Sequence, residues 1–403
     1  MFFALPNTAS FLAPDEGNYA FLAKWVGESK PVSEFPSFGQ GLYLSGRTMI
    51  VPASVLYRVG FDELDAVRLV ASTYGFCGLL ITVLFTLKIY GKNVASGVQG
   101  AHNENLVATL FLIFAFIPSH FVWSNLGLRE SATEFWLITA FIAFFVIFHH
   151  QKKITFPTLL LLSGSIILTF SARPQVGWVL GVALISYLFF NLGQINTYFV
   201  LPIVLCAVVL GSTLNTVNTV NTGSSLGDIF NPLLNAGEIV EYKQEVNQLD
   251  AASVIETQSC PIESSALESS PSTKFDTYFC IAWRAPYMVT TFLFRPVLGV
   301  DVTSTSSLFA AFENLVWLAF FVILFWLLIR RRTISFLRPL LPAVIFSFLY
   351  LLGASAYQGN MGTGFRHKSL ILWAVLLVIL AIAWRKPVEP VEITRNNSQE
   401  KAV

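Results

Sequence analysis

Long apolar stretches separated by short polar connections run along most of this chain. Nine of them are long enough to cross a bilayer, at residues 67–90, 105–123, 131–148, 154–171, 175–191, 198–214, 308–329, 337–357 and 369–384. Backbone groups in lipid must be paired within their own segment, so the pattern predicts nine transmembrane helices. The Arg173-Pro174 pair is expected to separate two of them in a tight hairpin. Residues 1–13 are apolar but too short to span, and are expected to be the end of a first helix that begins before this sequence.

The composition supports this interpretation. The chain has 403 residues, of which 54% are hydrophobic and only 12% charged. Soluble domains carry about 25% charged residues. A soluble protein, a disordered chain and a basic nucleic-acid binder are therefore excluded, and nucleic acid is not expected as a partner. The predicted fold class is an all-α polytopic membrane protein.

The same pattern divides the chain into five parts. Residues 1–66 contain the partial first helix and a first outer loop, and residues 67–214 form a six-helix transmembrane core. Residues 215–307 form a long outer loop, residues 308–384 three further transmembrane helices, and residues 385–403 a tail.

Basic residues predict the orientation. Ten of them lie in one set of connections: Lys88, Lys92, Lys152, Lys153, Arg330, Arg331, Arg332, Arg338, Arg385 and Lys386. Because cytoplasmic connections are rich in Lys and Arg, this face and the C-terminal tail are predicted to be cytoplasmic, in a bacterial plasma membrane. The long segment 215–307 carries ten acidic and four basic residues, as expected of the outer side.

The outer segment contains two further features. Cys260 and Cys280 could form a disulfide outside the cytoplasm, and the sequence leaves this open. Cys77 and Cys206 fall within spans and are expected to be packing residues. The stretch 285–300 is apolar and aromatic but is interrupted by Arg295-Pro296. It predicts an interfacial helix that covers the site and contacts an acceptor.

Several cations oppose the orientation rule, because they lie in the short outer loops. These are Arg129, Arg173, Arg366 and Lys368, together with His367. Any one of them could simply reach up to lipid phosphate. Cations on three separate loops favour a shared anionic ligand, and guanidinium groups suit phosphate because they bind it bidentately.

Carboxylates form the second candidate set. Asp15 and Glu16 follow the apolar N-terminal stretch, and Glu130 and Glu134 lie near the start of a predicted helix. Helix capping, dipole contacts and local ion pairs are the alternatives for these four. Glu313 lies inside a span, where an ionisable group is functional by default, although it could pair with Arg284 or Arg295. Arginines for a phosphate and a carboxylate for a base together suggest group transfer from a lipid phosphate.

Several short motifs resemble one enzyme family. Residues 14–20 (PDEGNYA) resemble the Asp-Glu motif in the first outer loop of GT-C glycosyltransferases, such as the protein O-mannosyltransferases and aminoarabinose transferases of family 39. The stretches that resemble later parts of these enzymes are 38–44 (FGQGLYL), 56–58 (LYR), 65–72 (DAVRLVAS), 125–131 (NLGLRES) and 364–368 (GFRHK). The resemblance covers most of the chain in layout, and the Asp-Glu motif is its most specific part.

The resemblance implies a GT-C-like helical bundle with outer-face amphipathic helices. It also implies an inverting transferase of cell-envelope biogenesis that takes a hexose or pentose from a polyprenyl-phosphate donor. The acceptor would be a lipid, glycan or protein on the outer face, with membrane lipids as further partners.

The resemblance also assigns roles to residues. Asp15 would be the catalytic carboxylate, supported by Glu16 and Glu130, and Asp15 and Glu130 could hold a divalent cation such as Mg, Mn or Ca. Arg129, Arg173, Arg366 and Lys368 would bind the donor phosphate. Tyr19, Arg295 and His367 would support the acceptor side.

Three other functions remain open from the sequence. A polysaccharide repeat-unit polymerase would also have many helices, a large outer loop and outer arginines. A transporter or flippase would show internal repeats and helices broken at the midplane, and no convincing repeat is present. A non-catalytic assembly subunit would not depend on Asp15.

Overall fold

The computed structural model describes residues 14–35, 37–90, 99–150, 155–190, 195–216, 271–302, 305–331, 340–357 and 361–383. Within these ranges every regular element is a helix, which confirms the all-α fold class. The helices are α1 (Pro14–Gly27), α2 (Ser37–Arg58), α3 (Glu63–Tyr90), α4 (Gln99–Phe116), α5 (Pro118–Asn125), α6 (Arg129–Phe145), α7 (Phe156–Ala172), α8 (Pro174–Phe190), α9 (Ile195–Thr216), α12 (Pro271–Phe294), α13 (Thr305–Arg331), α14 (Leu341–Tyr357) and α15 (Met361–Ala383). A 3-10 turn at Val32–Glu34 and a π-helical turn at Val146–His150 complete them.

All nine predicted apolar stretches lie on helices wherever the structure describes them, although several helix ends differ and one stretch is divided. The prediction of one continuous helix over residues 105–123 is wrong, because α4 ends at Phe116 and α5 begins at Pro118. Ile117 between them is extended, with φ −55° and ψ 127°. A proline ring disfavours helical backbone in the residue before it, so the chain turns here despite the unbroken apolar pattern. The expected separation at Arg173-Pro174 is confirmed, because Arg173 is extended between α7 and α8.

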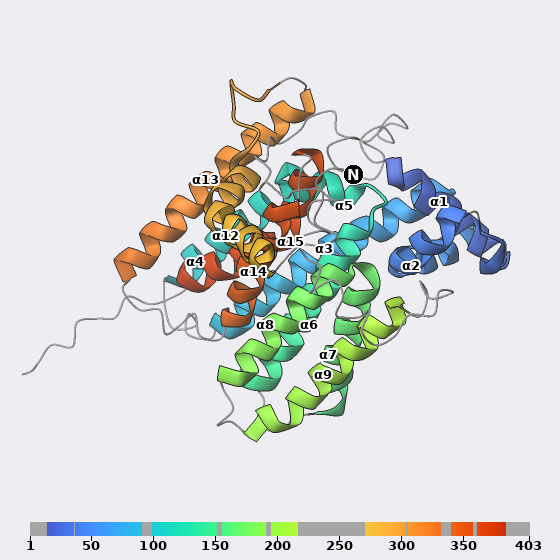
Figure 1. Cartoon of the computed structure of the whole chain (residues 1–403), viewed down its shortest axis with the longest axis horizontal. Coiled ribbons are helices and arrows are strands. Elements are labelled where there is room, and N and C mark those ends of the chain that lie inside the picture. The colour runs from blue at the N-terminus through green and yellow to red at the C-terminus, as the bar shows by residue number, and fades with distance from the viewer. Residues whose placement is uncertain are drawn as a thin grey trace, which may run out of the picture.

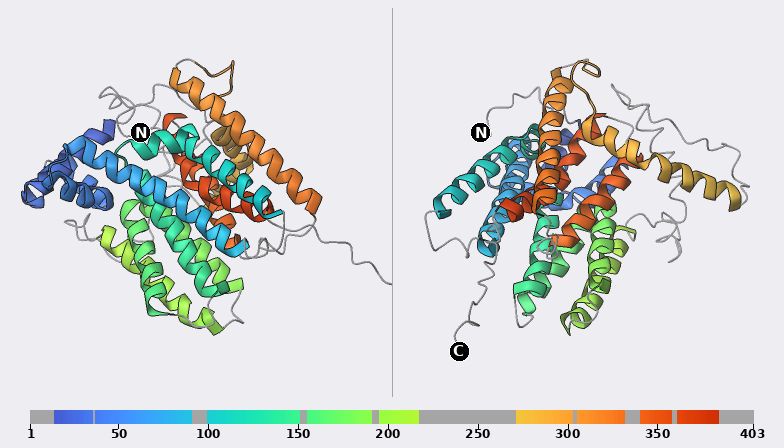
Figure 2. Two further views of the ribbon diagram at one scale, coloured as in Figure 1. Left: turned by 180° about the vertical axis from the view of Figure 1, so that it is seen from behind. Right: turned by 90° about the vertical axis from the view of Figure 1, so that its left-hand side faces the viewer.

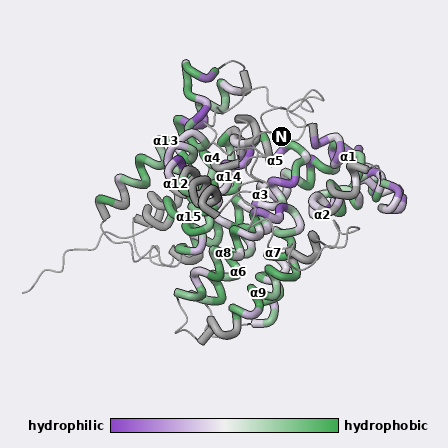
Figure 3. Tube along the Cα trace, in the orientation of Figure 1, coloured by the Kyte–Doolittle hydropathy of each residue, from purple (hydrophilic) through white to green (hydrophobic). Residues whose placement is uncertain are grey.

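The helices form an apolar bundle with a smaller lobe at one end. Helices α6 to α9 pack side by side, and α3, α13, α14 and α15 complete the main core (Figures 1 and 2). A second core joins α1 and α2 to the start of α3 and to the turn before α6. The most hydrophilic stretches gather at this α1–α2 end, whereas α6 and α9 are largely hydrophobic (Figure 3).

The chain is an integral membrane protein. Among the described residues, three helical segments are long and apolar enough to cross a bilayer: Glu63–Leu87, Arg129–Phe148 and Ser307–Trp326. Shorter apolar helices accompany them at Phe156–Ala172, Pro174–Phe190, Val200–Leu210 and Leu341–Ser355. Helix α13 exposes apolar side chains such as Phe312, Val322 and Phe325 along its length, which suits contact with lipid. The number of complete spans and the orientation stay predictions.

Helix α12 begins before the stretch that was expected to be interfacial. It projects from the side of the bundle (Figure 2, right) and contacts α13, α14 and α15. Phe279 and Trp283 are exposed, whereas Phe292 and Leu293 near the end of the helix are buried. The proposed disulfide lies outside the described residues, because they do not include Cys260.

We expect Gly177 to be required for the packing of α8 against α7. A Cβ atom there would lie 2.4 Å from the ring of Phe170, which is fully buried and cannot move away. Gly177→Ala should therefore destabilise the protein by about 1–3 kcal/mol, measured as thermal unfolding in detergent. Gly164→Ala on α7 is the matched control, because its Cβ would meet no atom within 4 Å. Equal stability of the two variants would contradict this packing.

Candidate functional site

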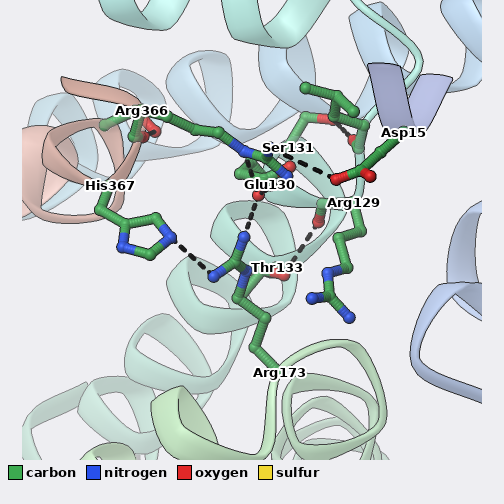
Figure 4. Close-up of polar contacts among 10 residues, drawn as sticks. Asp15, Arg129, Glu130, Ser131, Thr133, Arg173, Arg366 and His367 are labelled. Atoms are coloured by element: carbon green, nitrogen blue, oxygen red, sulfur yellow. Dashed lines mark hydrogen bonds and ion pairs between the residues drawn. The ribbon is translucent and has the colours of Figure 1, made fainter. Parts of the chain in front are cut away.

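Three elements far apart in the sequence meet around Glu130. Glu130 is the second residue of α6, Arg173 lies in the link between α7 and α8, and Arg366 lies on the second turn of α15 (Figure 4). Arg173 donates a hydrogen bond to Glu130 Oε1, and Arg366 Nε donates to the same oxygen over 2.5 Å. Glu130 is 1% exposed, so both pairs are shielded from water. Buried ion pairs lose much less to solvent screening than surface pairs.

His367 extends this cluster on the α15 side. Its Nε2 lies 2.8 Å from Arg173 Nη1, and the ring is buried. A guanidinium group can only donate hydrogen bonds, so His367 Nε2 must accept this one. The histidine is therefore neutral in this arrangement, with its proton on Nδ1. It orients Arg173 without adding charge.

Arg129 supplies a third guanidinium group. It is the first residue of α6, next to Glu130, and in Figure 4 its side chain points away from Glu130. Its Nε is buried and donates no hydrogen bond within the described residues. Two arginines therefore bind one buried carboxylate, and Arg129 adds a third positive charge nearby, so the three arginines and Glu130 together carry an excess of two positive charges. A buried, unsatisfied donor beside this excess is the arrangement expected of an anion site.

Asp15 lies at the exposed edge of the cluster. Its Oδ2 is 3.7 Å from Arg366 Nη1, and its side chain is 50% exposed (Figure 4). Tyr19, one turn further along α1, is buried against α2, where Gly46 leaves room for its ring. Burial raises the pKa of the Tyr19 hydroxyl, and the nearby Arg129 charge opposes this shift. Helix α1 thus brings a solvent-accessible carboxylate to the arginines.

Arg47 is a nearby residue that the sequence analysis did not select. It lies on α2, and its Nε donates a 2.7 Å hydrogen bond to Ser171 Oγ, two residues before Arg173. A further basic residue therefore contacts the end of α7. The only sequence signal was a basic residue shortly after the 38–44 motif, within a segment that was expected to be a loop.

Glu16 has a different environment from Asp15. It is fully buried and binds Arg68 on α3 through both oxygens, at 2.7 and 3.0 Å. Its Oε1 also accepts the Gly127 N–H, 2.8 Å away, in the turn between α5 and α6. Glu16 therefore ties α1 to two other elements, and a role in supporting Asp15 would act through this positioning.

Lys368 lies in a second buried cluster, apart from the three arginines. Its Nζ donates to Asn314 Oδ1 at 2.6 Å and to the Leu293 carbonyl at 2.9 Å, near the end of α12. The last carbonyls of a helix lack partners within it and are stabilised by cations. The structure therefore brings Arg129, Arg173 and Arg366 together but directs the predicted phosphate ligand Lys368 elsewhere.

Glu313 belongs to the same second cluster. Its Oε2 accepts the Ser119 N–H at 2.6 Å, and its Oε1 accepts the Trp317 indole N–H at 2.8 Å. Ser119 lies in the first turn of α5, whose N–H groups have no partner within the helix. Arg295, one of the arginines that could have paired with Glu313, binds Asp301 instead.

The two clusters belong to one ring of buried polar contacts that joins α6, α15, α13 and α5. The four inter-helix contacts are Glu130–Arg366, Lys368–Asn314, Glu313–Ser119 and His120–Glu134. Each helix contributes two residues to these contacts. The two are adjacent in α5 and in α13, two positions apart in α15 and four positions apart in α6. The position of Arg366 therefore depends on all four helices.

Arg295 stabilises a turn rather than the arginine cluster. Its guanidinium group binds both oxygens of Asp301, at 2.8 and 3.1 Å, and Asp301 also accepts the Val297 N–H. Burial alone would raise the pKa of Asp301, but these hydrogen bonds outweigh it and hold the pKa below its usual value. Asn314 Nδ2 binds the Pro296 carbonyl and fixes the turn to α13.

The surroundings of Glu130 do not suit a divalent cation. Two guanidinium groups already bind Glu130 Oε1, and Arg129 adds a third positive charge beside it. A metal ion between Asp15 and Glu130 would be placed against these arginines. Across the described part of the chain, no three His, Cys, Asp or Glu side chains are grouped closely enough to hold a metal.

Comparisons with known proteins give one match. No protein-family model matches the chain, and no curated protein matches it. Among solved structures, the apo crystal structure of ArnT from Cupriavidus metallidurans aligns over 92% of this chain and 73% of the ArnT chain. The identity is 14% and the TM-score 0.39.

We expect the Glu16–Arg68 pair to be required for stability. Glu16→Gln removes the charge that neutralises buried Arg68 and should cost about 3–5 kcal/mol of unfolding free energy. Glu34→Gln is the control, because Glu34 is exposed. Thermal unfolding in detergent measures both variants. A Glu16→Gln protein as stable as wild type would show that the pair does not hold α1 in place.

Proposed function

We propose that this chain is a membrane glycosyltransferase of the GT-C type. It would transfer a sugar from a polyprenyl-phosphate donor to a lipid, glycan or protein acceptor on the outer face of the membrane. The observation that supports this most is the excess positive charge of Arg129, Arg173 and Arg366 beside the accessible carboxylate of Asp15.

The donor phosphate is the anion that suits the arginine cluster. A phosphate diester or monoester carries negative charge, which would balance the positive charge that Glu130 leaves uncompensated. Guanidinium groups stay charged at any physiological pH and can bind two phosphate oxygens at once. The cluster lies at the first residues of α6, where N–H groups and the helix dipole also favour an anion. As the phosphate departs, the same arginines would stabilise the charge that develops on it.

Asp15 is the base in this proposal. The acceptor hydroxyl oxygen attacks C1 of the sugar, and the bond between C1 and the phosphate oxygen breaks. The phosphate leaves with the bonding electrons, and Asp15 takes the proton of the hydroxyl group. Half of the Asp15 side chain is open to solvent, so an acceptor can reach it. Glu130, enclosed by arginines, organises the phosphate site, and Glu16 positions α1.

We expect Asp15→Asn to lose transfer while keeping the fold. Removing a positioned base costs a factor of about 10²–10⁴ in rate. Vesicles containing the variant and a panel of polyprenyl-phosphate hexoses and pentoses would report release of polyprenyl phosphate. Asp65→Asn is the control, because Asp65 is an exposed carboxylate on α3. Full turnover by Asp15→Asn would disprove this role. Turnover only with lipid-linked oligosaccharides would instead indicate a repeat-unit polymerase.

We expect Arg366 to contribute to donor binding or to the transition state. Arg366→Ala should raise KM for the donor, or lower kcat if its contact strengthens as the phosphate leaves. Arg366→Lys should restore activity only in part, because an ammonium group lacks the planar fork. Arg58→Ala, which removes an exposed guanidinium group from α2, should leave both constants unchanged. Unchanged donor kinetics in Arg366→Ala would make this arginine a lipid anchor or a structural residue.

A further inference from the structure

A groove of about 450 Å³ lies on the exposed side of α1 and the start of α3. Its lining includes Gly17, Phe21 and Trp25 on α1, Lys30 after the helix, and Glu63 on α3. Pockets that hold small organic ligands are commonly about 300–1,000 Å³. None of the groove residues belongs to the arginine cluster, so the groove is a separate feature of the α1–α2 lobe.

The charges of the groove are balanced. Lys24 Nζ lies 3.4 Å from Glu63 Oε1, and Lys30 Nζ lies 2.6 Å from Glu28 Oε2. Two cations and two carboxylates leave no net charge to attract an ionic ligand. They do present several hydrogen-bond donors and acceptors at a partly exposed surface. A neutral ligand with many hydroxyl groups is complementary to such a lining.

Aromatic side chains form the apolar part of the groove. Phe21 and Trp25 lie with ring centroids 5.6 Å apart, and Phe21 is 39% exposed. Trp25 is held by a hydrogen bond from its indole N–H to the Pro31 carbonyl and by contact with Phe35. The Lys30 ammonium group lies over the Trp25 ring, 4.9 Å from its centroid, and covers one of its faces. Phe21 therefore offers the accessible ring, against which the C–H face of a sugar can pack.

We propose that this groove binds a neutral saccharide. The combination of aromatic rings with paired carboxylates and ammonium groups matches a ligand that has both apolar C–H faces and many hydroxyl groups. Binding does not require the transferase activity. The further role, holding the glycan part of an acceptor, rests on the proposed function.

The groove opens on a different face of α1 from Asp15. Gly17 lies two residues after Asp15, which is about 3 Å along the helix axis and about 200° around it. A saccharide in the groove would therefore have to pass around the N-terminal turn of α1 to approach Asp15. No atom lies within 4 Å of the position that a Cβ of Gly17 would occupy, so the wall of the groove is open at this end. A larger side chain at residue 17 would fill the groove without displacing the protein.

A size series at Gly17 tests the proposal. Purified protein in lipid nanodiscs would be applied to an array of neutral glucan, mannan, galactan and arabinan oligosaccharides, beside an array of random peptides. We expect wild type to bind at least one saccharide class, Gly17→Ala to bind similarly, and Gly17→Phe to bind at least tenfold more weakly with unchanged thermal unfolding. Phe21→Ala should weaken binding about tenfold.

Two controls separate the possible outcomes. Phe61→Ala removes a similarly exposed phenyl ring outside the groove and should change binding less than twofold. Asp15→Asn should bind saccharides as wild type does even where transfer is lost, so failure of the transferase proposal is distinguishable from failure of this one. No saccharide binding by wild type, equal binding by wild type and Gly17→Phe, or a preference for peptides would each overturn the proposal.

Discussion

The burial of Glu130 among arginines is the interaction on which the rest of the site depends. A carboxylate that is almost completely removed from water is stable only if cations and hydrogen bonds replace the solvent. Arg173 and Arg366 meet this need, and they come from the link between α7 and α8 and from α15. The bundle therefore has to close around Glu130. The closing elements bring more positive charge than one carboxylate neutralises, and this excess is the basis of the proposed phosphate site.

The ring of polar contacts explains how the arginines keep their positions inside an apolar bundle. Helices in lipid have no hydrophobic drive to associate, so specific packing and polar contacts between them carry more of the specificity. Lys368 and Asn314 hold the first turns of α15 against α13, while Glu313 joins α13 to α5. Removing a member would take a hydrogen-bond or ion-pair partner from a buried polar group in a medium that cannot replace it with water. The site is thereby coupled to the whole bundle.

The α1–α2 lobe provides a solvent-accessible carboxylate beside the buried arginines. Glu16, on the buried side of α1, holds this helix to α3. Asp15, the residue before it, stays half exposed to solvent. The groove along the outer side of α1 begins within one turn of Asp15. One short helix therefore presents a structural carboxylate, a candidate base and a candidate ligand surface on different faces. Neighbouring residues on a helix point in directions about 100° apart, which makes this division of roles possible.

The sequence by itself determined the helical class, the positions of the apolar helices and the break at Arg173-Pro174, because apolar length and proline act locally. It also identified Asp15, Arg129, Arg173 and Arg366 as candidates from charges in the outer connections. It did not predict α2, which lies in a segment that was expected to be a loop. Only the tertiary structure showed that Arg366 and Lys368 belong to different clusters. Two positions along a helix turn a side chain by about 200°, so one reaches Glu130 and the other Asn314.

The remaining differences between sequence and structure come from backbone geometry and from helix packing. Pro118 divides α4 from α5 although the apolar pattern runs through it, because a proline changes the backbone and leaves hydrophobicity untouched. Asp15 and Glu16 are adjacent carboxylates, and only the packing of α1 decides that Glu16 is the buried one. Only the structure shows that Arg47 lies near the site, because helix α2 places it against Ser171 at the end of α7. Local chemistry thus determined which elements form and which residues carry charge. Which charges meet was decided by the directions in which packed helices point their side chains.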